Sequence, residues 1–336
     1  MKNNQKILFS LFIVLLIFSN CESDSQLHEV TRRKFALGTI VKITVLDTDK
    51  TEARKAIDQA FNEINRIGSL FYKGNPKSPI YRFNHSKQDT LSLSEEIINW
   101  IFRSQKLARK TKGSFDITVG KIASLYTFDQ ENFQPPKKKK VDSLLNYVGY
   151  RKIAVDTSRN IVIKKDQRIK IITGGSAKGY AVDRAIKSLD TFKLAGALVS
   201  AGGDLRATPR EDKKKWTVGI RHPRRKDAIL GTIEIEKGAV ATSGDYEQFV
   251  DYNGKRYHHI ISPKSGYPAR ASRSTTIIAP TAELADALST GLFILGPEQG
   301  LQQIQEFSGC EALWVDSEGN YHSTKKFNDY LKNKLK

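Results

Sequence analysis

The sequence predicts an α/β or α+β fold with a substantial, mainly antiparallel sheet and flanking helices. The N-terminal half is dominated by helical apolar spacing, whereas short strand-like segments dominate from residue 153 onward. The chain has 336 residues, of which 39% are hydrophobic, which is sufficient for a proper core. This length suits one large domain or two closely packed subdomains.

Apolar residues spaced three and four apart predict the helices. Residues 51–67 form an amphipathic pattern, and Ser94 is expected to cap a second helix that extends toward Gly113. Pro135 and Pro136 mark an exposed loop, and helical structure is expected again over 141–145.

Short segments rich in β-branched residues predict the strands. A first strand is expected over 34–46, with a kink at Gly38. The other predicted strands span 153–155, 161–163, 169–172, 198–200, 216–220 and 231–235.

The N-terminus carries a targeting signal. Lys2 and Lys6 precede an apolar run over 7–16, which is too short to span a bilayer, and Cys21 follows. This pattern resembles a bacterial lipoprotein signal, in which Cys21 becomes the lipidated first residue. An ordinary signal peptide with an incidental cysteine is the alternative.

The signal defines the expected layout of the chain. Residues 1–20 are predicted as the signal peptide, 21–33 as a tether, and 34–332 as the folded domain. We expect an extracytoplasmic protein, on the periplasmic side, held to the membrane by its lipid anchor. Lipidation of Cys21 would leave Cys310 without a disulfide partner.

The formal net charge of +19 is unusually high. A solvated basic surface is one interpretation, and attraction to anionic lipid or to a polyphosphate ligand is another. No recognisable motif interleaves these charges with stacking aromatic residues, so nucleic acid is not an expected partner.

The segment over 173–185, T-G-G-S-A-K-G-Y-A-V-D-R-A, has the composition of a phosphate-binding corner. Its glycines allow close approach of the backbone, the following helix start presents free N–H groups, and Lys178 adds a positive charge. The spacing matches neither the P-loop nor the dinucleotide fingerprint.

A second segment offers oxygen ligands. On a helix, Asp286, Ser289 and Thr290 lie on one face, and a carboxylate with hydroxyls suits Mg²⁺. A polar stripe on an ordinary helix is the alternative. The sequence contains no zinc-binding spacing and no G-x-S-x-G elbow.

Three further segments are ambiguous when each is taken alone. The G-S-F-D-I-T segment fits either a site or a helix-capping glycine with a buried Phe115, and Gly202-Gly203-Asp204 is equally a tight turn. His258 and His259 lie on a predicted strand over 257–261 and therefore point to opposite faces, so at most one of them lines a given site.

Taken in order, these segments resemble the ApbE-type flavin transferases, also called FAD:protein FMN transferases. The matching segments, spread over residues 35–296, are Leu37-Gly38-Thr39, G-S-F-D-I-T (113–118), G-G-S-A-K-G-Y-A-V-D-R-A (174–185), S-A-G-G-D-L (200–205), A-T-S-G-D-Y (241–246), Y-H-H-I-I-S-P-K-S-G-Y-P (257–268) and A-D-A-L-S-T-G-L-F-I-L-G (285–296).

The resemblance implies a two-lobed fold with FAD in the cleft. It also implies Mg²⁺-dependent transfer of the FMN moiety of FAD to a threonine hydroxyl of a target flavoprotein, with release of AMP. The family's usual targets belong to membrane-bound or extracytoplasmic redox systems. A Mg²⁺-dependent FAD pyrophosphatase and a non-catalytic flavin-binding lipoprotein are the alternatives.

The resemblance also assigns site residues position by position. His259 matches the catalytic base. The metal ligands are Asp286, Ser289, Thr290 and the carbonyl of Gly175. The positions matching FAD contacts are Leu37, Tyr72, Ser114, Phe115, Asp116, Lys178 and Ile261.

Three positions depart from the family pattern. Ser262 and Ile172 stand where many members have aspartate, and Leu37 replaces the usual methionine. The loss of two carboxylates bears on how the isoalloxazine or ribose end is held and on how His259 is supported.

Overall fold

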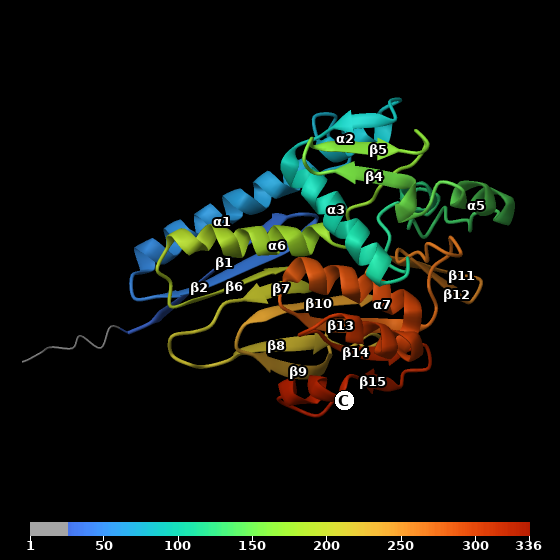
Figure 1. Ribbon diagram of the computed structural model, residues 1–336. Helices are drawn as coiled ribbons and strands as arrows, with labels where there is room; N and C mark the ends of the chain where they lie inside the picture. The colour runs from blue at the N-terminus through green and yellow to red at the C-terminus, as the bar shows by residue number, and fades with distance from the viewer. Residues whose placement is uncertain (1–25) are drawn as a thin grey trace, which may run out of the picture.

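The computed structural model describes residues 26–336, and an eight-stranded sheet forms its centre (Figure 1). The strand order is β1-β2-β6-β7-β10-β13-β14-β15, and every neighbouring pair is antiparallel. The predicted mainly antiparallel sheet is therefore confirmed. The strands are β1 (His28–Ala36), β2 (Thr39–Asp47), β6 (Gly196–Ala201), β7 (Asp204–Ala207), β10 (Gly238–Gly244), β13 (Ser272–Ala279), β14 (Glu311–Asp316) and β15 (Tyr321–Ser323).

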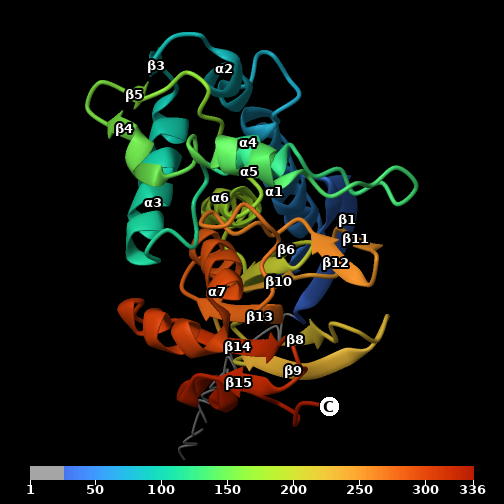
Figure 2. The ribbon, with the colours of Figure 1, turned by 90° about the vertical axis from the view of Figure 1, so that its right-hand side faces the viewer.

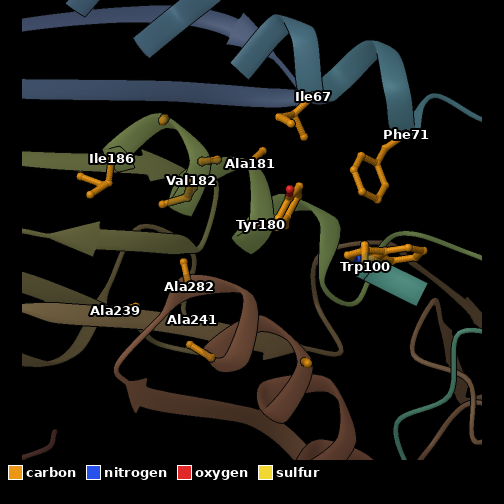
Figure 3. Packing of buried hydrophobic residues seen from close by; sticks show 14 of the residues in the cluster. Ile67, Phe71, Trp100, Tyr180, Ala181, Val182, Ile186, Ala239, Ala241 and Ala282 are labelled. Carbon is orange, nitrogen blue, oxygen red and sulfur yellow. The ribbon is translucent and has the colours of Figure 1, made fainter. Parts of the chain in front are cut away.

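Three helices, α1 (Lys50–Phe71), α6 (Ala177–Ser188) and α7 (Ala282–Gln303), cover one face of this sheet. Small residues let α6 and α7 lie close together; a Cβ on Gly179 would come within 2.1 Å of the Ala282 carbonyl oxygen. Figure 3 shows the apolar side chains of α6 packed between α1 and the sheet, with Trp100 beside Phe71. This packing fixes the start of α6 against two other helices.

The opposite face of the sheet is partly covered by a two-stranded ribbon of β8 (Trp216–Arg221) and β9 (Ile229–Ile235). Figure 2 shows the ribbon on the side of the sheet away from α7. Trp216, Ile220 and Ile233 pack with Val240 and Phe327 in a second apolar core.

The second lobe lies beyond the helices. It contains α2 (Pro79–His85), α3 (Glu95–Lys110), α4 (Gly120–Ala123), α5 (Lys138–Leu145) and a small sheet of β3 (Thr90–Ser92), β5 (Ile161–Lys164) and β4 (Ile153–Asp156). A hairpin of β11 (Phe249–Tyr252) and β12 (Lys255–His258) packs against α4 and α5 through a separate apolar cluster. The predicted helices over 51–67, 94–112 and 141–145 correspond to α1, α3 and α5, although the side chain of Ser94 makes no capping hydrogen bond.

The structure corrects two predictions near the N-terminus. Residues 34–46 are not one kinked strand but the β1–β2 hairpin, because Leu37 (φ 55°) and Gly38 (φ 73°) form a left-handed turn. Residues 28–33, predicted as part of the tether, belong to β1, so the folded domain includes them. The predicted signal peptide and Cys21 lie outside the described residues.

The predicted strand over 169–172 is wrong. This segment is extended, but it forms only an isolated bridge, between Val119 and Lys170. The side chain of Asn84 takes the place of a neighbouring strand: its amide donates to the Ile171 carbonyl (2.9 Å), and its oxygen accepts from the Ile171 N–H (2.8 Å).

The helices described over residues 26–336 include none with the length and apolar character that a membrane span requires.

Candidate active site

The N-terminal end of α6 and the preceding glycines form one wall of the candidate site. Ser176 is fully buried, and its hydroxyl accepts a hydrogen bond from the indole of Trp100 (3.1 Å). This contact anchors the glycine segment to α3. Two residues later, Lys178 forms an ion pair with Asp204, which follows the Gly202-Gly203 turn.

Lys178 is held as a positive charge. Partial burial by itself would lower its pKa, but the carboxylates of Asp204 and Asp286 outweigh this effect, and the net pKa of the lysine is raised. Its side chain retains 35% exposure, whereas that of Asp204 is 2% exposed. The ammonium group therefore stays available to a ligand while a buried carboxylate orients it.

Asp286 lies on α7, directly beside the start of α6. Its Oδ2 accepts a hydrogen bond from the Gly179 N–H (3.0 Å), and within residues 26–336 its Oδ1 receives none. Burial is the main cause of a strongly raised pKa, to which Asp204 adds while Lys178 opposes it. A carboxylate this buried is poised to be neutralised by a bound cation or a proton.

Hydroxyl groups gather around the same point. The Ser243 hydroxyl, from the end of β10, lies 2.8 Å from Ser289 Oγ and 3.3 Å from Thr290 Oγ1. Gly175 is close as well, since a Cβ placed on it would lie 3.4 Å from Thr290 Oγ1. Ser289, Thr290 and Gly175 thus lie close together, and Asp286 precedes Ser289 by three residues on α7, with its backbone carbonyl accepting from the Ser289 hydroxyl (2.8 Å).

The chemistry of this donor set fits Mg²⁺. It offers hard oxygen atoms with one carboxylate, Asp286, which is typical of magnesium sites that share their ion with substrate phosphates. Among the described residues, no group of three or more His, Cys, Asp or Glu side chains could hold a metal ion. The hydroxyl and carbonyl oxygens of the candidate set differ from the cysteine and histidine ligands that zinc prefers.

The two histidines have different environments. The His258 ring is buried; its Nε2 donates to the Ala269 carbonyl (2.7 Å), and its Nδ1 accepts from the Ile260 N–H (3.3 Å). Strand β12 ends at His258, so the predicted strand over 257–261 is too long. Within residues 26–336, the backbone N–H of His259 donates to the Gln248 carbonyl (3.0 Å), and the same backbone carbonyl also favours the charged form of the ring.

The His259 ring therefore keeps one nitrogen available to a ligand. Its ring reaches solvent, but the surrounding protein reduces its hydration; this desolvation, with smaller effects of His258 and Lys178, lowers the pKa of His259 to about 4. The imidazole is neutral at physiological pH and can accept a proton.

The G-S-F-D segment packs against α7. The buried ring of Phe115 lies against Gly175, and Ser114 lies against Gly291. The carboxylate of Asp116 accepts hydrogen bonds from the Thr118 N–H and hydroxyl (2.8 and 2.6 Å) and from the Tyr150 N–H (2.6 Å). Asp116 thus organises its own loop, and a direct contact of its carboxylate with FAD stays a prediction.

A groove of about 570 Å³ adjoins this segment. Ser114 and Ser262 line it, together with Lys264 and Leu295. Ser262, where many family members have aspartate, therefore faces the same groove as a predicted FAD contact. Ile261 is buried and bridges to Pro268, behind this loop.

The two remaining predicted FAD contacts lie near the C-terminal end of α1. Leu37, in the β1–β2 turn, packs close to Gly68, and Tyr72 follows the last residue of α1 with 63% exposure. The neighbouring Phe71 contacts Trp100, which in turn bonds Ser176, so this end of α1 adjoins the glycine segment.

The sequence assigns no role to Ser243, and it leaves the Gly202-Gly203-Asp204 segment open between a functional site and a tight turn. Ser243 and Asp204 each come from a strand far along the chain from the residues they contact, and no local spacing relates them. Their presence in the A-T-S-G-D-Y and S-A-G-G-D-L segments was the available signal.

The fold and the site define a two-lobed α/β enzyme. Its lysine ammonium group and its oxygen ligands lie at one end of an antiparallel sheet. The chain belongs to the ApbE family, whose model matches residues 37–314. An FAD:protein FMN transferase of Klebsiella pneumoniae is 30% identical over 86% of this chain and 84% of its own. One from Haemophilus influenzae is 28% identical over 89% of this chain and 90% of its own.

Solved structures are similar over nearly the whole chain. A crystal structure of an ApbE protein from Thermotoga maritima has a TM-score of 0.83 and 34% identity, covering 92% of this chain and 100% of that one. The flavin transferase ApbE from Vibrio cholerae has a TM-score of 0.80 at 22% identity, over 91% of this chain and 100% of its own, and supports the fold alone.

Proposed function

We propose that this protein transfers the FMN moiety of FAD to a threonine hydroxyl of a target flavoprotein and releases AMP. Family membership supports the reaction class. The observation that carries the proposal is the junction of α6 and α7, where the Gly179 N–H bonds Asp286 while Lys178 presents its ammonium group beside it. This junction offers positive charge and oxygen ligands to a pyrophosphate.

Side chains of the protein itself can accept the proton of the attacking threonine and neutralise the charge of the FAD phosphates. The threonine oxygen attacks the phosphorus of the FMN half, and the bond from that phosphorus to the AMP oxygen breaks. Neutral His259 accepts the threonine proton, a role typically worth roughly 10²–10⁴-fold in rate. Lys178 neutralises phosphate charge, and the positive end of the α6 dipole adds to it, although the N–H groups of Ser176 and Ala177 already donate to the Thr173 carbonyl.

Asp286, Ser289, Thr290 and the carbonyl of Gly175 are the residues that would hold Mg²⁺. When bound, Mg²⁺ neutralises phosphate oxygens and favours departure of AMP. Ser243 supports this set through its hydrogen bonds with the two α7 hydroxyls.

The proposed setting is extracytoplasmic, with the protein anchored to the membrane through a lipid on Cys21. The apolar run and cysteine of the first 21 residues support this location. The proposed partner is a flavoprotein of a membrane or extracytoplasmic redox system.

Intact-mass measurement tests the reaction. The protein is incubated with FAD, Mg²⁺ and the soluble domain of an extracytoplasmic flavoprotein. A gain of one FMN on the flavoprotein is the expected result. Free FMN and AMP with an unmodified flavoprotein would indicate a pyrophosphatase, and intact FAD would indicate a flavin-binding protein.

A further inference from the structure

The outer edge of strand β8 is unpaired. β8 pairs with β9 on one side only, within residues 26–336. The outer edge of β9, by contrast, is covered by the C-terminal segment, where the N–H groups of Lys332 and Lys336 donate to the carbonyls of Thr232 and Leu230 (2.9 and 2.8 Å). Only one edge of the ribbon is therefore open.

The pairing register shows which backbone groups of β8 are free. Because the Thr232 carbonyl points to the C-terminal segment, its partner across the ribbon, Gly219, directs its own N–H and C=O away from β9. The same holds for Thr217, two residues earlier. Both residues are exposed.

These free groups border a cavity of about 520 Å³. All six residues of β8 line it, including both faces of the strand, as expected where a cavity runs along a strand edge. The facing wall is the underside of β2, β6 and β7, with half-buried Lys42, Ser200 and Leu205. In the described part of the chain, the ribbon leaves this part of the sheet without a covering layer.

One end of the cavity leads to the candidate active site. Gly203 and Glu247 line it; Gly203 directly precedes Asp204, the partner of Lys178. Glu247 pairs with Arg221 at the end of β8 (3.2 Å), and its charge acts on Lys178. A chain lying along β8 is thus directed toward the Lys178 end of the sheet.

We propose that an extended segment of the acceptor flavoprotein binds along β8 as an added antiparallel or parallel strand. This inference rests on the proposed function and concerns how the acceptor reaches the site. Main-chain hydrogen bonds to Thr217 and Gly219 hold the segment, and its side chains cover the exposed underside of β2 and β6. Among the charged residues that line the cavity, Lys42, Lys215 and Glu29 have no ion pair in the described chain; the two lysines outnumber the one carboxylate, which favours a segment carrying carboxylates.

The residues of β8 suit an edge that accepts a partner. Edge strands are usually protected by charges or proline. Strand β1 carries Arg32, Arg33 and Lys34 at the outer edge of the main sheet, whereas residues 216–220 contain neither charge nor proline. Gly219 permits close approach of another backbone.

A proline at position 217 tests the pairing in the full-length protein. Thr217→Pro removes an N–H that faces away from β9, so the ribbon itself keeps its hydrogen bonds. Thr217→Ala is the matched control because it keeps that N–H. The probe is FAD with a library of threonine-containing decapeptides, and attached FMN is counted by mass spectrometry.

We expect kcat/KM for the peptides to fall at least tenfold in Thr217→Pro, with Thr217→Ala close to wild type and FAD affinity unchanged in both. Equal flavinylation by the proline variant and the wild type would overturn the inference while leaving the proposed function intact. A wild-type protein that binds FAD but modifies neither the peptides nor the flavoprotein domain would refute the proposed function and the inference with it, whereas transfer to the flavoprotein domain without transfer to any peptide would overturn the inference alone.

Amide hydrogen exchange gives a second readout that does not depend on the proline variant folding. The best-transferred peptide, with its acceptor threonine replaced by valine, should protect the amides of Thr217 and Gly219 at least tenfold. Val218, already bonded to β9, should not change. Protection of these amides before any peptide is added would overturn the inference, because another segment would then already cover the edge of β8. If that protection is lost in a chain starting at residue 26, the covering segment is the protein's own N-terminal segment. If it rises with protein concentration, the covering segment belongs to a second copy of the protein.

Discussion

At the scale of single residues, hydrogen bonding gives two adjacent histidines different roles, one structural and one proposed to be catalytic. Both ring nitrogens of His258 are used within the protein, one to the Ala269 carbonyl and one to the Ile260 N–H. These bonds end β12 and set the path of the loop that carries His259. The ring of His259 interacts with the Gln248 carbonyl and keeps its other nitrogen for proton exchange.

The lowered pKa of His259 predicts the pH dependence of transfer. Its base form is already present at pH 5, because its pKa is about 4 rather than near 6.5. At saturating Mg²⁺, which would keep Asp286 ionised despite its raised pKa, we expect kcat/KM to stay nearly level from pH 7 to pH 5 and to fall as the pH drops through about 4. A fall centred near pH 6.5 would contradict this environment for the ring. The profile is measured with stopped time points and mass spectrometry of the acceptor.

Ser243 provides a second prediction at this scale. Ser243→Ala removes the hydroxyl that bonds Ser289 and Thr290, so the α7 hydroxyls lose their support from β10. We expect the Mg²⁺ concentration for half-maximal transfer to rise roughly tenfold, the equivalent of about 1.4 kcal/mol. Thr242→Val is the control, because Thr242 bonds Thr276 instead. Calorimetric titration of Mg²⁺ into the FAD-loaded protein should show the same shift, and an unchanged affinity would exclude this role.

At the scale of elements, the periodicity of apolar residues predicts those helices and strands whose formation depends on burying one face. The helix over 51–67 and the strands over 216–220 and 231–235 were predicted correctly, because their apolar spacing matches the face each buries. The segment over 169–172 has the same apolar character but pairs with the Asn84 side chain instead of a strand. No pattern within the segment itself reveals that partner.

The same distinction applies to the candidate site. Asp286, Ser289 and Thr290 belong to one helix, so their common face follows from helical spacing. Ser243 and Asp204 reach the site from separate strands, β10 and β7, and only the folded sheet brings them together. The β1–β2 hairpin was missed because Leu37, a residue uncommon at positive φ, occupies its turn.

The contact between α6 and α7 supports a prediction of stability. In Gly179→Ala the new methyl group would collide with the Ala282 backbone, 2.1 Å from its carbonyl oxygen, and force the helices apart. We expect a loss of about 1–3 kcal/mol in the free energy of unfolding. Gly174→Ala is the control, since a Cβ there meets no atom within 4 Å. Urea unfolding midpoints compare the two, and equal midpoints would mean that the helices adjust without cost.

At the scale of the whole molecule, the sheet separates two functional faces. Its helical face ends at the junction of α6 and α7, where the groups proposed to bind pyrophosphate meet. Its opposite face carries the β8–β9 ribbon and the open strand edge. The second lobe adds His259 through the β11–β12 hairpin, so FAD and the acceptor would approach the same end of the sheet from different sides.

The proposed anchor is also a property of the whole chain. Cys21→Ser removes the only atom to which the proposed lipid would attach, so we expect the protein to move from the membrane fraction to the soluble extracytoplasmic fraction. Immunoblots of fractionated cells measure the distribution, with Cys310→Ser, which changes the buried cysteine, as the control. Membrane retention of Cys21→Ser would argue against a lipid on this residue.

The central claim is that the end of the sheet carrying Lys178, Asp286 and His259 couples FAD cleavage to acceptor modification. The most direct measurement is the ratio of AMP released to FMN attached, in wild type and in His259→Ala, with FAD affinity measured alongside. We predict one AMP per attached FMN for wild type, and loss of both products at unchanged FAD affinity for His259→Ala. AMP release without attached FMN, or a His259→Ala protein as active as wild type, would contradict the account.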